Sequence, residues 1–305
     1  MKILVATDKP FAKEAVEGIK NIVEKSGNEF LLLEKYTQKS QLLEATAVAD
    51  AVIIRSDLID SEVIANSNTL KIVVRAGAGY DNVDLKAATE KGIVVMNTPG
   101  QNSNAVAELA IGMMVYMARG LFNGKSGTEL RGKTLGIHAF GYVGKLVAEI
   151  AKGFGMEVLA FDPFVADEVI IKAGVTPVKS VEELYKKSMY ISLHIPANDK
   201  TKNSVNFDLL NLMPKGATLV NTARKEVINE EGLLKMMEQR PDFKYVSDIE
   251  PGCKATFEEK YQGRYYFTPK KMGAQTEEAN INAGYAAAEQ IVKFFKTGDT
   301  TFKVN

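Results

Sequence analysis

Short apolar segments alternate with amphipathic stretches along nearly the whole chain. The apolar segments predict strands at residues 3–6, 30–33, 51–54, 72–74, 93–96, 134–137, 158–161, 190–193, 218–220 and 244–246. Apolar residues at helical spacing predict helices at residues 12–25, 38–47, 105–119, 142–152, 230–239 and 277–296. Strands that alternate with helices in this way predict an α/β protein, with parallel sheets covered by helices on both faces.

The chain length and two turn-rich segments indicate more than one domain. At roughly 150 residues per domain, the 305 residues of the chain suggest two domains. Residues 97–102 and 268–273 are rich in Pro, Gly and polar residues, and each precedes a predicted helix. We therefore expect these two segments to act as joints between domains.

The composition argues against several classes of protein, including nucleic-acid-binding, membrane, secreted and zinc proteins. Lys plus Arg (38) equals Asp plus Glu (38), which disfavours non-specific binding to nucleic acid or to an anionic membrane. No apolar run approaches the roughly 20 residues that span a bilayer, and the N-terminus becomes polar too early for a secretory signal. With a single cysteine, Cys253, we expect a soluble cytoplasmic protein without disulfides. Two histidines, His138 and His194, are too few for a three-histidine zinc site, and no metal is expected.

Residues 134–144 form the segment with the clearest chemistry. They follow a predicted strand, open a predicted helix and resemble G-x-G-x-x-G, with Ala139 at the first glycine position. Gly141 would let the backbone approach a pyrophosphate, and Gly144 would allow close packing of helix and strand. Asp162 ends the next strand, where a carboxylate accepts hydrogen bonds from the ribose of NAD and repels the 2′-phosphate of NADP. The alternative is a glycine-rich turn beside a surface carboxylate.

Five segments together resemble one family along nearly the whole chain. They are residues 74–84, 92–99, 132–144, 220–224 and 276–279, and they are similar to the D-isomer-specific 2-hydroxyacid dehydrogenases. The resemblance implies two Rossmann-like, doubly wound parallel-sheet domains flanking a cleft, with NAD as cofactor. Residues 1–98 plus 276–305 would form the substrate-binding domain and residues 99–275 the NAD-binding domain. The two joints would then act as hinges whose closure excludes water.

Within the family, the resemblance is strongest to the phosphoglycerate dehydrogenases, which lead into L-serine biosynthesis. It implies that Arg55 with Ser56, and Arg75 with Ala76 and Gly77, face the substrate phosphate. Arginine suits this role because its planar, permanently charged guanidinium matches phosphate oxygens. Arg55 could instead be a surface residue after a strand. Because the sequence ends soon after the last predicted helix, we expect no C-terminal regulatory domain.

The resemblance also implies the catalytic residues. Arg224 matches the arginine that binds the substrate carboxylate and polarises the carbonyl oxygen, although the usual Gly-Gly after it is Lys225-Glu226 here. The histidine base of the family is missing, and the alignment places Lys271, or less well Lys270, at its position. A lysine could act as a base if burial and nearby cations lower its pKa, or it could stay charged and polarise the oxygen. Glu250 is the candidate for the acid that orients the base.

The remaining cofactor contacts follow from the same resemblance. They are the phosphate-loop residues Ala139, Phe140, Gly141, Tyr142, Val143 and Gly144, then Asp162, His194 and Pro196 on the adenine side, Asn221, Thr222 and Ala223, and Asp248 on the nicotinamide side. His138 is expected to be a packed core residue, and Cys253 has no assigned role. Helix 105–119 would form either a homodimer interface, as is common in the family, or part of the interior.

Three functions fit these residues. The leading one is NAD-dependent oxidation of 3-phospho-D-glycerate to 3-phosphooxypyruvate, a small anionic substrate. The second is reduction of an unphosphorylated 2-keto acid such as glyoxylate or hydroxypyruvate. The third, motivated by the missing histidine, is a non-catalytic NAD-sensing protein, against which the retained arginines argue.

Overall fold

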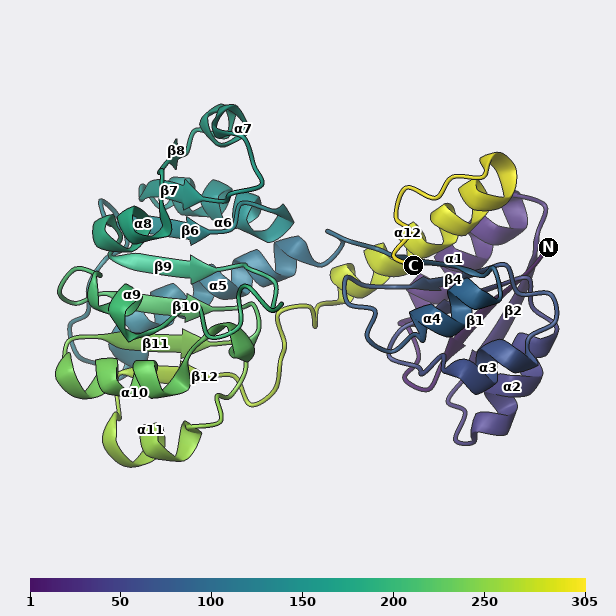
Figure 1. Ribbon diagram of the computed structural model, residues 1–305, viewed down its shortest axis with the longest axis horizontal. Helices are drawn as coiled ribbons and strands as arrows, with labels where there is room; N and C mark the ends of the chain where they lie inside the picture. Colours follow the sequence, from purple (N-terminus) through teal and green to yellow (C-terminus); the bar gives the residue numbers. More distant parts are fainter. The chain divides into compact units, whose positions relative to one another are not determined.

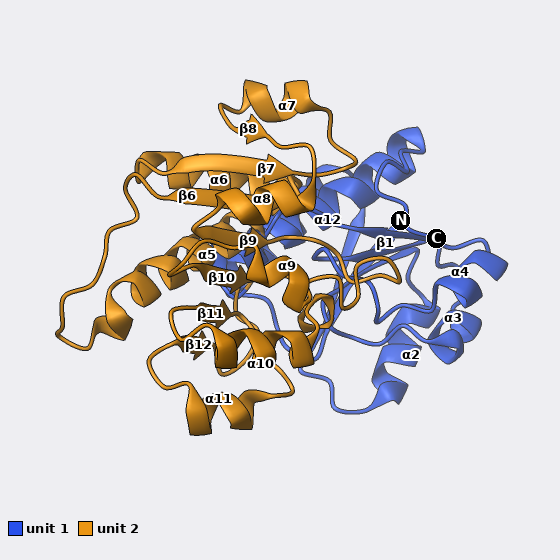
Figure 2. Cartoon of the chain, turned by 60° about the vertical axis from the view of Figure 1, so that its left-hand side comes forward, with its two compact units in different colours: residues 1–102, 275–305 blue, residues 103–274 orange.

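The chain forms two compact units (Figure 2), and the computed structural model describes all 305 residues. Unit 1 comprises Met1–Asn102 and Gln275–Asn305, and unit 2 comprises Ser103–Ala274. Unit 2 starts where helix α5 (Ser103–Ala118) starts, because this helix packs against the sheet of unit 2. The boundaries expected from the sequence, 98/99 and 275/276, lie within a few residues of these.

Unit 1 is a five-stranded sheet whose strands are all parallel (Figure 1). The order β2-β1-β3-β4-β5 places the topological switch point between β1 and β3, where ligands bind in open α/β sheets. The strands are β1 (Lys2–Thr7), β2 (Glu29–Glu34), β3 (Ala51–Ile54), β4 (Ile72–Arg75) and β5 (Val94–Asn97). The helices are α1 (Lys13–Lys25), α2 (Lys39–Ala47), α3 (Ser61–Asn66), α4 (Leu85–Glu90) and α12 (Glu277–Thr297).

Helices cover both faces of this sheet. Consecutive residues of a strand point to opposite faces, and here the residues on both faces are apolar. Ile3 and Val5 belong to the core beneath α1 and α12, while Leu4 and Ala6 face the core beneath α2, α3 and α4. The helix α12 lies against α1 although the two are far apart in sequence (Figure 1). Gly284 permits this approach, because a Cβ there would lie 2.8 Å from Ile19 Cδ1.

Unit 2 is a seven-stranded parallel sheet in the order β12-β11-β10-β9-β6-β7-β8. Counted within the unit, this is the 3-2-1-4-5-6 order of dinucleotide-binding sheets with one added strand, and its switch point lies between β6 and β9. The strands are β6 (Thr134–His138), β7 (Glu157–Phe161), β8 (Thr176–Pro177), β9 (Tyr190–Leu193), β10 (Thr218–Asn221), β11 (Lys244–Ser247) and β12 (Tyr265–Phe267). Besides α5, the helices are α6 (Tyr142–Gly153), α7 (Asp167–Lys172), α8 (Val181–Lys187), α9 (Phe207–Asn211), α10 (Glu230–Gln239) and α11 (Lys254–Lys260), with short 3-10 turns η1 (Gly120–Phe122) and η2 (Lys225–Val227).

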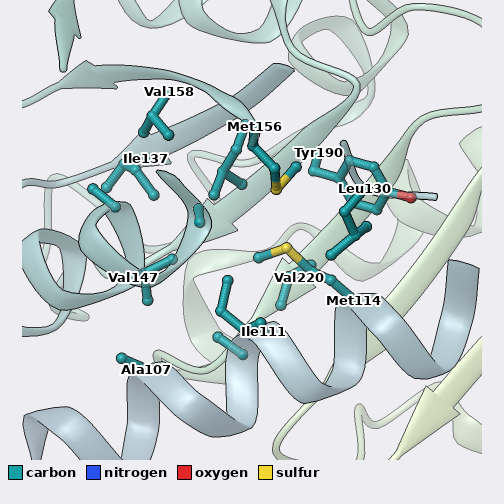
Figure 3. Packing of buried hydrophobic residues seen from close by; sticks show 14 of the residues in the cluster. Ala107, Ile111, Met114, Leu130, Ile137, Val147, Met156, Val158, Tyr190 and Val220 are labelled. Atoms are coloured by element: carbon teal, nitrogen blue, oxygen red, sulfur yellow. The ribbon is translucent and has the colours of Figure 1, made fainter. Parts of the chain in front are cut away.

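Helix α5 is apolar because it is packed inside unit 2. Ala107, Ile111 and Met114 project from α5 toward Val147 of α6 and toward the sheet (Figure 3). Interior packing therefore accounts for the apolar pattern, for which a dimer interface was the alternative explanation.

The expected fold class is confirmed: both sheets are parallel, with helices on both faces. All ten expected strands are present, with ends that differ by one residue or none. The strands β8 and β12 were not expected, because Thr176–Pro177 and Tyr265–Phe267 are too short to produce a recognisable pattern. None of the helices is long and apolar enough to span a membrane.

We expect the contact between α1 and α12 to stabilise unit 1, and a substitution at Ile19 tests this. Ile19→Ala removes a side chain with no exposed surface and should lower the free energy of unfolding by about 2–5 kcal/mol. Urea unfolding followed by circular dichroism measures this change. Lys20→Ala, which alters an exposed neighbour, should change it by less than about 0.5 kcal/mol. Equal effects of the two substitutions would show that α12 does not depend on this contact.

Candidate active site

The phosphate loop connects β6 to α6 in a geometry that glycine normally supplies. Ala139 has a φ of 81°, which costs a residue with a side chain on the order of 1–3 kcal/mol. Its N–H donates to the Phe161 carbonyl at 2.9 Å, which holds the loop against the end of β7. Gly144 is required one turn later, because a Cβ there would lie 2.3 Å from the Ala139 carbonyl oxygen.

Asp162 lies beside this loop and is held by backbone N–H groups. Its Oδ2 accepts from Phe140 N at 2.8 Å, and its Oδ1 accepts from Phe164 N at 2.9 Å. The N–H of Phe140 is therefore not free for a phosphate, and its side chain is fully buried in the core. Phe140 thus positions Asp162, and its expected contact with the cofactor stays a prediction. The Asp162 carboxylate keeps lone pairs that could accept from ribose hydroxyls.

These residues fit the NAD expected from the sequence. Side chains of Ser180, Asn206 and Asn229 cap α8, α9 and α10, but no side chain caps α6 at Gly141. Gly141 is exposed, with no atom within 4 Å of where its Cβ would be, so the first N–H groups of α6 are accessible to a pyrophosphate. The exposed Tyr142 and half-buried Val143 begin this turn.

Both histidines lie at the switch point of unit 2, and neither carries a positive charge at neutral pH. The His194 N–H donates to the His138 carbonyl at 2.9 Å. Burial lowers the pKa of His138 to about 4, and burial with the neighbouring His138 lowers the pKa of His194 to about 3. His138 Nδ1 lies 3.2 Å from the buried Tyr185 hydroxyl, so this residue is part of the core, as expected. Pro196, two residues beyond His194, is exposed.

The loop after β10 presents Arg224 at the carboxyl edge of the sheet. Asn221 braces this loop: its Oδ1 accepts from Ala223 N at 2.9 Å, and its Nδ2 donates to the Arg224 carbonyl at 3.1 Å. The buried Thr222 points its Oγ1 toward His194 Nδ1, 3.4 Å away. Arg224 is exposed, and its guanidinium forms no hydrogen bond or ion pair, which leaves it available for an anionic ligand.

Lys271, rather than Lys270, lies beside this loop. Its Nζ donates to the Ala223 carbonyl at 2.5 Å, whereas Lys270 is exposed and contacts no acceptor. Although much of the Lys271 side chain is exposed, its ammonium group lies among protein atoms near Arg224. This desolvation and the Arg224 charge lower the pKa of Lys271 to about 8, against the opposing effects of Asp248 and Glu226.

Asp248 has a structural task that the sequence did not indicate. Its carboxylate is 1% exposed and accepts from Thr268 Oγ1 at 3.0 Å, from Met272 N at 2.8 Å and from Gly273 N at 2.7 Å. These bonds fix the segment on both sides of Lys271. A Cβ at residue 273 would lie 2.8 Å from Asp248 Oδ2, so glycine is needed there.

Glu250 is not brought together with the candidate base. Its Oε1 accepts at 2.6 Å from Nζ of Lys254, the first residue of α11. The shortened Asp248-Ile249-Glu250-Pro251 segment leaves no contact between this carboxylate and Lys271. Its expected role as the orienting acid therefore stays a prediction without support from the geometry.

In unit 1, two arginines meet at the carboxyl ends of adjacent strands. Arg75 Nε donates to the Arg55 carbonyl at 3.0 Å, and Ala76 N donates to the Ile54 carbonyl at 2.8 Å. Gly77 has a φ of 146°, and a Cβ there would collide with the Arg75 guanidinium. Burial lowers the pKa of Arg55, but guanidinium groups start so high that it stays charged at neutral pH. Ser56 is exposed beside them.

Comparison with known proteins agrees with this site. The family profile described as "D-isomer specific 2-hydroxyacid dehydrogenase, NAD binding domain" matches residues 108–251. D-3-phosphoglycerate dehydrogenase of Methanocaldococcus jannaschii is 36% identical over 280 residues, covering 85% of this chain and 52% of that protein. Hydroxypyruvate reductase of Thermotoga maritima is 33% identical over 308 residues, covering 95% of this chain and 97% of that protein. The chain therefore spans about half the length of the first relative and nearly all of the second.

A solved structure gives the same result. The crystal structure of NAD+-bound 3-phosphoglycerate dehydrogenase from Entamoeba histolytica is 50% identical, with a TM-score of 0.86, and covers 100% of this chain and 98% of that one. The chain belongs to the D-isomer-specific 2-hydroxyacid dehydrogenase family. The resemblance inferred from the sequence is confirmed, and so is NAD as the cofactor, since unit 2 contains the NAD-binding domain.

We expect the close packing at Gly144 to be needed for NADH binding, and this can be tested by measuring the Kd for NADH. Gly144→Ala would force α6 away from the Ala139 carbonyl and should weaken NADH binding about tenfold or more. Fluorescence titration with NADH measures the Kd. Gly153→Ala, in the last turn of the same helix, adds a Cβ in open space and should leave the Kd unchanged. An unaltered Kd in Gly144→Ala would contradict the assignment of this loop.

Proposed function

We propose that the chain oxidises 3-phospho-D-glycerate to 3-phosphooxypyruvate with NAD. The observation that carries this proposal is the position of Lys271, whose Nζ lies against the Ala223 carbonyl, near the free guanidinium of Arg224, with a lowered pKa. A base and a cation on adjacent loops are what oxidation of a 2-hydroxy acid requires. The names of the Methanocaldococcus jannaschii relative and of the Entamoeba histolytica structure support the substrate.

Lys271 would act as the general base for the hydroxyl group of the substrate. In its neutral form the amine keeps one N–H on the Ala223 carbonyl, and its lone pair can take the hydroxyl proton as the carbon–oxygen double bond forms. NAD supplies the acceptor for the hydride that leaves the same carbon. The lysine ends protonated, and the reverse reaction starts from that form. Its pKa of about 8 leaves roughly one molecule in ten neutral at pH 7.

Arg224 would bind the substrate carboxylate and polarise the oxygen at the reacting carbon. Its exposed guanidinium has no partner to displace, so a carboxylate could bind through two parallel hydrogen bonds. Arg224 also contributes to the lowered pKa of Lys271. The hydrogen bonds of Asp248 and Asn221 would hold the loops that carry Lys271 and Arg224 in place. This reduces the entropy lost when the two side chains are ordered around the substrate.

Arg55 and Arg75 of unit 1 would bind the substrate phosphate. Their proximity at the ends of β3 and β4 concentrates positive charge near the switch point of that sheet. Reduction of an unphosphorylated keto acid is the second candidate, because the Thermotoga maritima relative that matches nearly end to end is named hydroxypyruvate reductase. The expected homodimer and cytoplasmic location stay predictions.

The two candidates differ in their dependence on Arg55. We expect wild-type protein to oxidise NADH with 3-phosphooxypyruvate at a much higher kcat/KM than with hydroxypyruvate, the same keto acid without phosphate. Arg55→Ala should lower kcat/KM for 3-phosphooxypyruvate by about 100-fold and affect hydroxypyruvate far less, since an arginine–phosphate contact is lost. Turnover of hydroxypyruvate alone would favour the reductase, and turnover of neither would favour an NAD-binding protein without activity.

The pKa of Lys271 predicts opposite pH profiles in the two directions. Because oxidation needs the neutral amine, its kcat/KM should rise about tenfold per pH unit and level off above pH about 8. Reduction needs the ammonium form, so its kcat/KM should fall above the same pH. Lys271→Arg stays protonated and should lose about 100-fold or more in oxidation, together with the pH dependence.

Lys270→Ala provides the matched control, since Lys270 is exposed one residue away. This variant should keep both the rate and the pH profile of wild type. Full oxidation activity in Lys271→Arg would contradict the role of Lys271 as base and favour a cation that polarises the oxygen while water takes the proton.

A further inference from the structure

The guanidinium of Arg55 is held on several sides by neutral groups. Its Nη1 donates to the carbonyls of Lys9 at 3.3 Å and Pro10 at 3.2 Å, and its Nη2 donates to Asn280 Oδ1 at 2.6 Å. The group lies over the Phe11 ring, 5.1 Å from its centroid. These contacts fix the plane and the direction of a long side chain that would otherwise sample many rotamers.

Asn280 reaches Arg55 from the first turn of α12, 225 residues along the chain. Its own orientation is set locally, because its Nδ2 donates to the Thr276 carbonyl at 2.7 Å. This bond directs the amide nitrogen toward its own helix and the amide oxygen toward the guanidinium. The amide is therefore a fixed acceptor for Arg55.

The contacts leave part of the guanidinium unused. Nε of Arg55 makes no hydrogen bond, and Nη2 has a second N–H beyond the one that Asn280 accepts. No carboxylate forms an ion pair with the group. Asp57 and Asp8 lie near enough to favour its charged form, and Asp57 accepts from the backbone N–H of Arg55 at 3.2 Å. Arg55 therefore keeps its charge and a free N–H pair that matches two phosphate oxygens.

We propose that Asn280 is a positioning residue that makes Arg55 selective for a doubly charged phosphate. The neutral oxygen of Asn280 orients the guanidinium without adding to the negative charge of Asp57 and Asp8. A carboxylate in the same place would form an ion pair with Arg55 and repel a phosphate. Glu277 and Glu278 lie earlier in the same helical turn, whereas the position that contacts Arg55 carries a neutral amide. The proposal rests on the proposed function, because it assigns the phosphate to Arg55.

The competing explanation is that Asn280 only stabilises the fold by holding Arg55 in place. The Asn280→Asp variant distinguishes this structural role from the proposed role in phosphate selectivity. The aspartate keeps an acceptor near Arg55 Nη2 and would form an ion pair with it, so a brace would be retained or strengthened. Under the proposal, the same variant should raise KM for 3-phosphooxypyruvate about tenfold or more, with kcat within about twofold of wild type and no loss in Tm. KM for hydroxypyruvate and for NADH should stay within about twofold of wild type.

Asn280→Ala removes the acceptor without adding charge and should raise KM for 3-phosphooxypyruvate by a smaller factor, about threefold to tenfold. Asn282→Ala is the matched control, because Asn282 is exposed on the same helix and makes no hydrogen bond. An Asn280→Asp enzyme with unchanged KM for 3-phosphooxypyruvate would overturn the proposal. So would an equal rise in KM for both keto acids.

Calorimetric titration with 3-phospho-D-glycerate separates this proposal from the proposed function. If wild type binds this ligand and Asn280→Asp weakens binding about tenfold, the proposal stands even when no turnover is observed and the assigned reaction fails. If wild type turns over 3-phosphooxypyruvate and the Asn280 variants bind phosphoglycerate as wild type does, only the proposal fails. If wild type binds no phosphoglycerate, both are overturned.

Discussion

Every strand in each sheet runs parallel to its neighbours, so the carboxyl ends of each sheet lie along a single edge. The candidate residues of both units depend on this constraint, because they follow strands directly. Arg55 follows β3 and Arg75 ends β4, while Asp162, Asn221 and Asp248 end or follow β7, β10 and β11. Residues that are tens of positions apart in sequence become neighbours because the sheet aligns the ends of their strands.

The proposed oxidation adds a second requirement, which is a base that can exist partly neutral in a chain without a suitable histidine. Both histidines are buried near each other, where their low pKa values make them useless as proton acceptors at neutral pH. The pKa of Lys271 is lowered to about 8 because desolvation, and then the nearby charge of Arg224, disfavour its charged form. The carboxylate that could cancel this effect, Asp248, is occupied by Met272 N, Gly273 N and Thr268 Oγ1. The same contacts that place Lys271 therefore also limit how far Asp248 stabilises its ammonium form.

Particular residues show how far local sequence can predict the site. The pattern around Ala139, Gly144 and Asp162 is contiguous apart from one helix, so spacing alone predicts their neighbourhood. Phe140 is part of the same motif, yet its N–H is used by Asp162 and its side chain is buried in the core. Asn280 had no signal in the sequence, because its partner Arg55 lies in the first quarter of the chain and the amide is one of many polar residues on α12.

The alternation of apolar and amphipathic segments by itself determined the α/β class and nearly all of the strands, because burial on both faces of a parallel sheet demands that pattern. The sequence also determined the dinucleotide loop and the lack of a histidine in the segment around Lys270 and Lys271, since both are local features. Only the tertiary structure decided that Lys271 rather than Lys270 lies near Arg224, that Glu250 pairs with Lys254, and that Asn280 holds Arg55. These contacts depend on which loops the edge of the sheet and the buried Asp248 bring together. Hydrogen bonds between residues distant in sequence produce no periodic pattern along the chain, so the sequence alone does not predict them.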